Sequence, residues 1–130
     1  MAKIQLRKAT DVLADQLESP DVRAEWDRTA PARAVAHRVL AYRVEHGLSQ
    51  TALGKLLGMP QPAIARIESG EHVPTIDTLV RLSDGLGIEF SLNIVPPSKE
   101  AALISDEVQR APVVEEAATI HGGRLLLAAR

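Results

Sequence analysis

The sequence predicts an all-α fold, a bundle of four to five helices followed by one β-strand. Apolar residues make up 45% of the 130 residues but aromatic residues only 2%. The core must therefore be built from Leu, Val, Ile and Ala, which suits small packed helices. Most of the chain up to residue 87 has apolar residues at helical spacing, bounded by capping residues. One later segment alternates apolar and polar residues, as a half-buried strand does.

The chain is long enough for one domain with additional segments. We expect an N-terminal helical arm at residues 1–30 and the main helical domain at residues 31–87. A strand is expected at residues 88–95, followed by a tail at residues 96–130 that is partly helical or disordered. Within this tail, the stretch "SKEAALISDEVQRA" is a candidate helix.

Capping residues predict where four helices of the main domain begin and end. Ser and Thr side chains cap helix starts, and Gly adopts the left-handed conformation that ends helices. The expected boundaries are Gly47 at the end of the first helix, Ser49 and Gly58 around the second, Gly70 after the third, and Thr75 with the Gly85/Gly87 pair around the fourth. The positions expected to face the core are Val35, Val39, Leu40, Tyr42, Leu53, Leu56, Leu57, Ile64, Ile67, Ile76, Leu79, Val80 and Leu82.

The segment "IEFSLNIV" predicts a strand that needs a partner. Ile88, Phe90, Leu92 and Ile94 alternate with polar residues. The only other candidate strand, "GRLLLAAR" at residues 123–130, is weak. A second copy of the chain is the simpler partner, so we expect these four apolar residues to be the dimerisation contacts of a homodimer.

The run from Gln50 to Ser69 has the pattern of a helix-turn-helix. Two short amphipathic helices flank a turn of about three residues. Gly54 is small where the two helices are expected to cross closely, and Gly58 lies where the turn needs a positive φ.

The stretches "YRVEHGLSQTALGKLLGMPQPAIARIESG" and "PTIDTLVRLSDGLG" resemble the phage-repressor-like (XRE) helix-turn-helix family over residues 33–87. The resemblance implies binding to double-stranded operator DNA. It also implies that Arg43 and Glu68 form an ion pair that orients the first helix of the domain against the third. Such a pair holds geometry more than it adds stability.

The resemblance assigns DNA contacts to individual residues of this chain. Gln50 is expected to contact a phosphate and to brace Gln61, whose amide contacts a base edge. Ala63 is expected near a thymine methyl, and Arg66 near guanine or a phosphate. The expected phosphate contacts, for which ordinary solvated surface is the alternative, are Lys55, His72 and Thr75. Because the net charge is −2, binding is expected to need a two-fold dimer.

Two prolines flank the first residue of the expected recognition helix. Pro60 stands where the family usually has a capping Ser or Thr. Pro62 disfavours the α-region for Gln61 but loses no intrahelical hydrogen bond in the first turn. We therefore predict that the helix starts at Pro62, with Gln61 outside it.

The segments on both sides of the domain resemble small antitoxins of bacterial toxin–antitoxin pairs. The arm "SPDVRAEWDRTAPARAVAHRVL" is similar to the HigA type, whose cognate toxins are RelE/HigB-like ribonucleases, and "LGIEFSLNIVPP" is similar to the HipB type, whose partner is a HipA-like kinase. The resemblance implies a repressor of its own operon that also neutralises a toxin. The candidate toxin contacts are Leu13, Leu17, Val22 and Trp26, and the alternative is that they pack on the first helix of the domain.

Two further interpretations stay open: a stand-alone transcriptional regulator, and a protein-interaction module that uses the helix-turn-helix as a scaffold. An enzyme has little support, because the four histidines lack metal-ligand spacing and the chain has no cysteine. We expect no cofactor and no metal. No apolar run is long enough for a membrane span, and "MAKIQLRKAT" lacks a secretory signal, so we expect a cytoplasmic protein.

Overall fold

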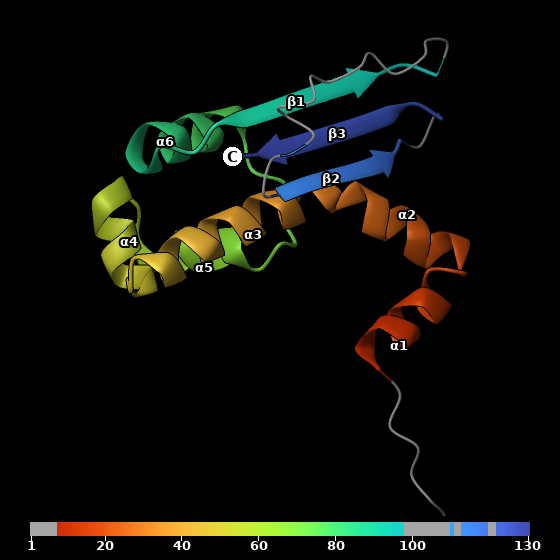
Figure 1. Ribbon diagram of the computed structural model, residues 1–130, viewed down its shortest axis with the longest axis horizontal. Coiled ribbons are helices and arrows are strands. Elements are labelled where there is room, and N and C mark those ends of the chain that lie inside the picture. The colour runs from red at the N-terminus through yellow and green to blue at the C-terminus, as the bar shows by residue number, and fades with distance from the viewer. Residues whose placement is uncertain (1–7, 98–109, 111–112, 120–121) are drawn as a thin grey trace, which may run out of the picture.

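The computed structural model of the protein describes residues 8–97, 110, 113–119 and 122–130. Within these residues, six helices precede a three-stranded sheet (Figure 1). The helices are α1 (Ala9–Gln16), α2 (Pro20–Arg28), α3 (Ala30–Glu45), α4 (Gln50–Leu57), α5 (Gln61–Glu68) and α6 (Ile76–Leu86), and the strands are β1 (Phe90–Val95), β2 (Val113–Ala118) and β3 (Arg124–Ala129).

The predicted caps of α4 and α6 are confirmed. The Ser49 Oγ accepts a hydrogen bond from the Ala52 N–H at 3.0 Å, and the Thr75 Oγ1 accepts one from the Thr78 N–H at 3.2 Å. Gly58 and Gly87 end these helices in the left-handed conformation. By contrast, Ser19 precedes α2 without a side-chain cap hydrogen bond.

Helix α3 is the centre of the fold. It packs against α5 of the helix-turn-helix and also against β2 and β3 of the sheet. Its first half is buried on both sides, because Ala30, Ala32, Ala34 and Ala36 allow neighbouring elements to approach closely around Val35. The helix that packs against the helix-turn-helix is therefore also the support of the sheet.

The prediction of an all-α class is wrong for the C-terminal part of the chain. Strands β1, β3 and β2 lie side by side in that order, and both pairs are antiparallel. The sequence of β3 does not alternate between apolar and polar residues, because both faces of this strand are covered. Leu127 and Ala129 on one face and Ala128 on the other are all buried, so the strand forms a continuous apolar run.

Strand β1 finds its partner within the chain. Phe90 lies opposite Ala129 and Val95 opposite Arg124 in the antiparallel register with β3. The expectation that β1 needs a second copy for a partner is therefore wrong, and the weak "GRLLLAAR" candidate is its partner. The opposite edge of β1 has no strand beside it in the described sheet (Figure 1). The candidate helix in the tail lies, apart from Arg110, outside the described residues.

Four positions expected to face the core are exposed. Leu40, Leu56, Ile76 and Val80 have 39%, 54%, 65% and 52% of their surface exposed. In α6, Leu82 and Leu86 are the buried residues, and Ile76 and Val80 lie outside the stripe that they define. The largest fully buried side chains are those of Val35, Val39, Leu53, Ile64, Leu82 and Ile88.

Arg33 joins the N-terminal arm to α3 and the sheet. Its guanidinium lies 3.5 Å from the centre of the Trp26 ring and donates to the Trp26 carbonyl at 2.6 Å. It also lies 3.7 Å from the carboxylate of Glu115 on β2. Burial lowers the pKa of Arg33, while the charges of Glu115 and Asp27 act in the opposite direction. This contact joins α2 to α3 and the sheet, although neither α1 nor α2 has a buried residue.

No described helix has both the length and the apolar composition that a membrane crossing requires.

Candidate nucleic-acid interface

Helices α4 and α5 form a helix-turn-helix whose tight crossing depends on glycine. A Cβ atom at Gly54 would overlap the carbonyl oxygen of Met59 and would lie 3.5 Å from a side-chain carbon of Ile64. The Met59 N–H donates to the Gly54 carbonyl at 2.8 Å, and Gly58 has a φ of +66°. The turn is therefore held by backbone contacts that leave no space for a side chain at residue 54.

Helix α5 starts at Gln61, so the prediction of a start at Pro62 is wrong by one residue. Pro60 is the extended cap residue, and its carbonyl accepts the Ala63 N–H at 3.0 Å. The restriction that Pro62 places on Gln61 is a preference, which this first helical hydrogen bond outweighs. Pro62 itself loses nothing, because an N–H in the first turn has no intrahelical acceptor.

A chain of hydrogen bonds connects the end of α3 to the start of α5. Arg43 donates to Glu68 through Nε at 2.6 Å and through Nη2 at 3.2 Å. The Gln50 amide donates to the Glu68 Oε2 at 2.7 Å, and the Gln61 amide donates to the Gln50 Oε1 at 2.7 Å. Each side chain is thus positioned by the one before it. The Glu68–Gln50 bond was not predicted from the sequence.

The Arg43–Glu68 pair is the anchor of this chain. Glu68 is largely buried, with 7% of its side chain exposed, and Arg43 also donates to the Leu48 carbonyl at 3.1 Å. The hydrogen bond with Glu68 raises the pKa of Arg43 above its ordinary value. A bidentate pair of this kind fixes geometry as well as charge.

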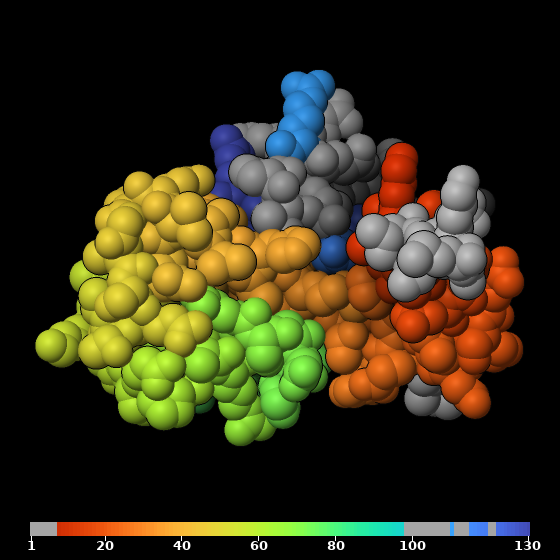
Figure 2. Space-filling model, turned by 90° about the horizontal axis from the view of Figure 1, so that it is seen from below, coloured from red at the N-terminus to blue at the C-terminus, as the bar shows by residue number. Residues whose placement is uncertain are grey.

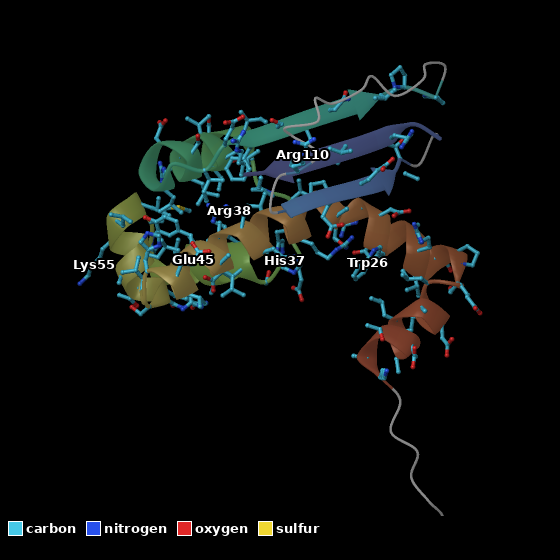
Figure 3. The ribbon with its side chains drawn as sticks, viewed as in Figure 1. Trp26, His37, Arg38, Glu45, Lys55 and Arg110 are labelled. Atoms are coloured by element: carbon cyan, nitrogen blue, oxygen red, sulfur yellow. The ribbon has the colours of Figure 1, made fainter. Side chains whose placement is uncertain are left out.

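The predicted DNA contacts fall into two groups and one outlier. Gln50 and Gln61 meet at the helix N-termini, and Figure 2 shows α4 and α5 as one continuous yellow to yellow-green surface. Lys55 extends from α4 away from the rest of the fold (Figure 3). The remaining predicted contacts line a hollow between α5 and the start of α6, and these are Ala63, Arg66, His72 and Thr75. Among them, Arg66, His72 and Thr75 are exposed and Ala63 is half-buried.

The predicted dimerisation residues do not share one environment. Ile88 is 1% exposed and belongs to the core, so it is not available for a dimer contact. Phe90 packs partly against the core. Leu92 and Ile94 on β1 are 45% and 64% exposed. Only these last two present apolar surface next to the free edge of β1.

The predicted toxin contacts also differ from one another. Val22 is exposed, and Leu13 and Leu17 are half-buried. Trp26 is covered by the Arg33 guanidinium and is therefore engaged within the fold. The described residues contain no group of three or more histidine or carboxylate side chains placed to hold a metal ion.

The turn between α4 and α5, with the side-chain network that supports it, defines a helix-turn-helix protein. Comparison with known families agrees, because residues 39–93 match the family model described as helix-turn-helix. This part of the chain is similar to helix-turn-helix transcriptional regulators of the XRE type.

Two curated proteins are similar to the chain. It is 30% identical over 83 residues to the HTH-type transcriptional regulator SutR of Escherichia coli (strain K12), which covers 64% of this chain and 47% of that protein. It is 41% identical over 63 residues to an uncharacterized HTH-type transcriptional regulator of Haemophilus influenzae, covering 48% of this chain and 62% of that protein. The chain thus matches about half to three fifths of the length of these relatives. No solved structure is significantly similar to it.

Proposed function

We propose that the protein is a sequence-specific DNA-binding transcriptional regulator that uses α5 as its recognition helix. The observation that carries the proposal is the exposed Gln61 amide at the start of α5, which Gln50 holds at 2.7 Å. A glutamine amide pairs with adenine through one donor and one acceptor. The names of both relatives as transcriptional regulators support this function.

The regulator acts as a homodimer that pairs the free edges of β1. A chain of net charge −2 makes few phosphate contacts, so one copy binds DNA weakly. Antiparallel pairing of two β1 strands would extend the sheet and would cover Leu92 and Ile94, which are otherwise exposed. Two recognition helices would then contact half-sites about one helical turn of DNA apart.

We further propose that the regulator is an antitoxin that represses its own operon and neutralises a cognate toxin, a RelE/HigB-like ribonuclease. The supporting observation is the N-terminal arm. α1 has no buried residue, and Val22 on α2 is exposed, so apolar surface is available to a partner. A tagged copy expressed with the neighbouring gene should co-purify with that gene's product. A stand-alone regulator would purify without it.

The proposed DNA binding is tested by mobility shift with the DNA upstream of the protein's own gene at two salt concentrations. We expect specific retention that weakens at high salt and is lost in Gln61→Ala and in Arg66→Ala. Arg81→Ala is the matched control, because Arg81 is an exposed arginine on α6 outside the proposed contacts. Absence of binding, even with the neighbouring gene product added, would instead favour a protein-interaction module.

A further inference from the structure

A hollow lies directly beside the recognition helix. It has a volume of about 230 Å³ and is formed by α3, α5, the segment after α5 and the first turn of α6. In Figure 2 the green surface of this segment lies against the orange surface at the start of α3. We propose that this hollow binds a small apolar monocarboxylate, which competes with DNA for the same residues. The competition, though not the binding itself, rests on the proposed DNA-binding function.

The inner part of the hollow is apolar. Ala32 and Val35 of α3, which are 1% and 0% exposed, form its floor. Met59 from the turn and Ile67 from α5 are half-buried beside them. Ligand pockets for drug-sized molecules measure about 300–1,000 Å³. The smaller volume here selects a short, unbranched or compact apolar tail.

The rim of the hollow supplies the polar groups that select a carboxylate. The Arg66 guanidinium has no ion-pair partner among the described residues, and His72 lies on the same rim. Thr75 and Thr78 add two hydroxyl groups, whose oxygens are 3.0 Å apart. No aspartate or glutamate lines the hollow. The bond between the two threonines uses one hydroxyl proton, so a single anionic head meets a cation and one hydroxyl donor but no opposing carboxylate.

The position of the hollow couples its occupant to DNA binding. Four of the residues that line it are proposed DNA contacts, namely Ala63, Arg66, His72 and Thr75. A carboxylate that pairs with the Arg66 guanidinium prevents this group from contacting a base or a phosphate. Carboxylate and DNA therefore exclude each other, and the small molecule acts as a releasing signal.

Binding is tested first without DNA, by NMR titration of the full chain with hexanoate. We expect the methyl resonances of Val35, Met59 and Ile67 to shift with saturation. Hexan-1-ol, which matches the tail without the charge, should bind at least tenfold more weakly. Butanoate, which is two methylenes shorter, should bind roughly fifteenfold more weakly, because each buried methylene contributes roughly fourfold.

Two substitutions of Thr78 provide a matched pair. Thr78→Leu fills the hollow, whereas Thr78→Val keeps its space, and both remove the same hydroxyl. We expect Thr78→Val to bind hexanoate a few-fold more weakly, because one hydroxyl is lost, and Thr78→Leu to lose binding altogether. Equal binding by the two variants, or unshifted methyl resonances in the unmodified protein, would overturn the site.

The second measurement adds hexanoate to the complex with upstream DNA. If the two ligands compete, hexanoate should release the protein from DNA at the concentration that saturates the methyl shifts, and hexan-1-ol should not release it. Saturated hexanoate binding without any release would overturn the competition. Hexanoate binding by a protein that does not bind DNA would support the site and refute the proposed function, so the two failures are distinguishable.

Discussion

The Gln61 amide nitrogen donates to the Gln50 Oε1 at 2.7 Å and so joins the first residues of the two helices of the motif. This bond uses one of the two amide protons of Gln61 and leaves its second N–H and its carbonyl oxygen available. Those are the two groups that pair with N7 and N6 of adenine. Gln50 is in turn held by Glu68, so the orientation of Gln61 depends on residues in α4 and α5.

Gln50→Ala should weaken specific DNA binding through Gln61. We expect Gln61→Ala to cost about 1–3 kcal/mol of specific binding free energy, because a bidentate base contact is lost. Gln50→Ala should cost a similar amount, and the double substitution little more than either one. Fluorescence anisotropy with specific and unrelated duplexes measures these energies. Additive losses would show that the two side chains act independently.

Breaking the Arg43–Glu68 pair should destabilise the domain. Arg43→Gln leaves a largely buried carboxylate without its cation, and we expect the free energy of unfolding to fall by about 2–3 kcal/mol. Urea denaturation measures this fall. Arg43→Gln combined with Glu68→Gln should recover part of the loss, since no unpaired charge remains. A double variant as unstable as the sum of the two single variants would contradict this account of the pair.

Gly54→Ala should be more damaging than the same substitution at Gly85. The new Cβ at residue 54 meets a backbone oxygen that cannot move without opening the turn, so we expect a loss of at least about 2 kcal/mol. At Gly85 the new Cβ meets the end of the Leu57 side chain, which can rotate. The gain in helix propensity of about 1 kcal/mol partly offsets that contact. Thermal unfolding of the two variants tests the order, and equal losses would contradict it.

Charge on the free edge of β1 should break the homodimer. Ile94→Lys places a cation where two β1 strands are proposed to pair, and sedimentation analysis should then show monomers. Val80→Lys is the matched control, because Val80 on α6 has a similar exposure. A monomer produced by Val80→Lys but not by Ile94→Lys would place the second copy on α6 instead.

The helix-turn-helix could be predicted from the sequence because its signals are local. Ser49 and Thr75 cap helices through neighbouring backbone groups, and Gly58 provides a positive φ, so a few adjacent residues determine these features. The start of α5 was misplaced by one residue because the preference set by Pro62 competes with a hydrogen bond to Pro60. Sequence preferences do not tell whether the restriction from Pro62 or the hydrogen bond to the Pro60 carbonyl has the larger effect.

The sheet could not be predicted because its signal is not local. β1 pairs with β3, which begins almost 30 residues after β1 ends, and an apolar run such as "RLLLAA" fits a buried strand or a buried helix equally well. The prediction that Ile76 and Val80 face the core failed for a related reason. Helical spacing indicates which residues share a side of α6, but the neighbouring elements decide which side is covered.

The central claim is that α5 determines a DNA sequence through Gln61. Selection from a random duplex library, followed by sequencing, tests it without knowledge of the operator. The account predicts two symmetric half-sites about one helical turn apart, each with an adenine that is no longer enriched when Gln61→Ala is used. An unenriched library, or the same adenine selected by Gln61→Ala, would contradict it.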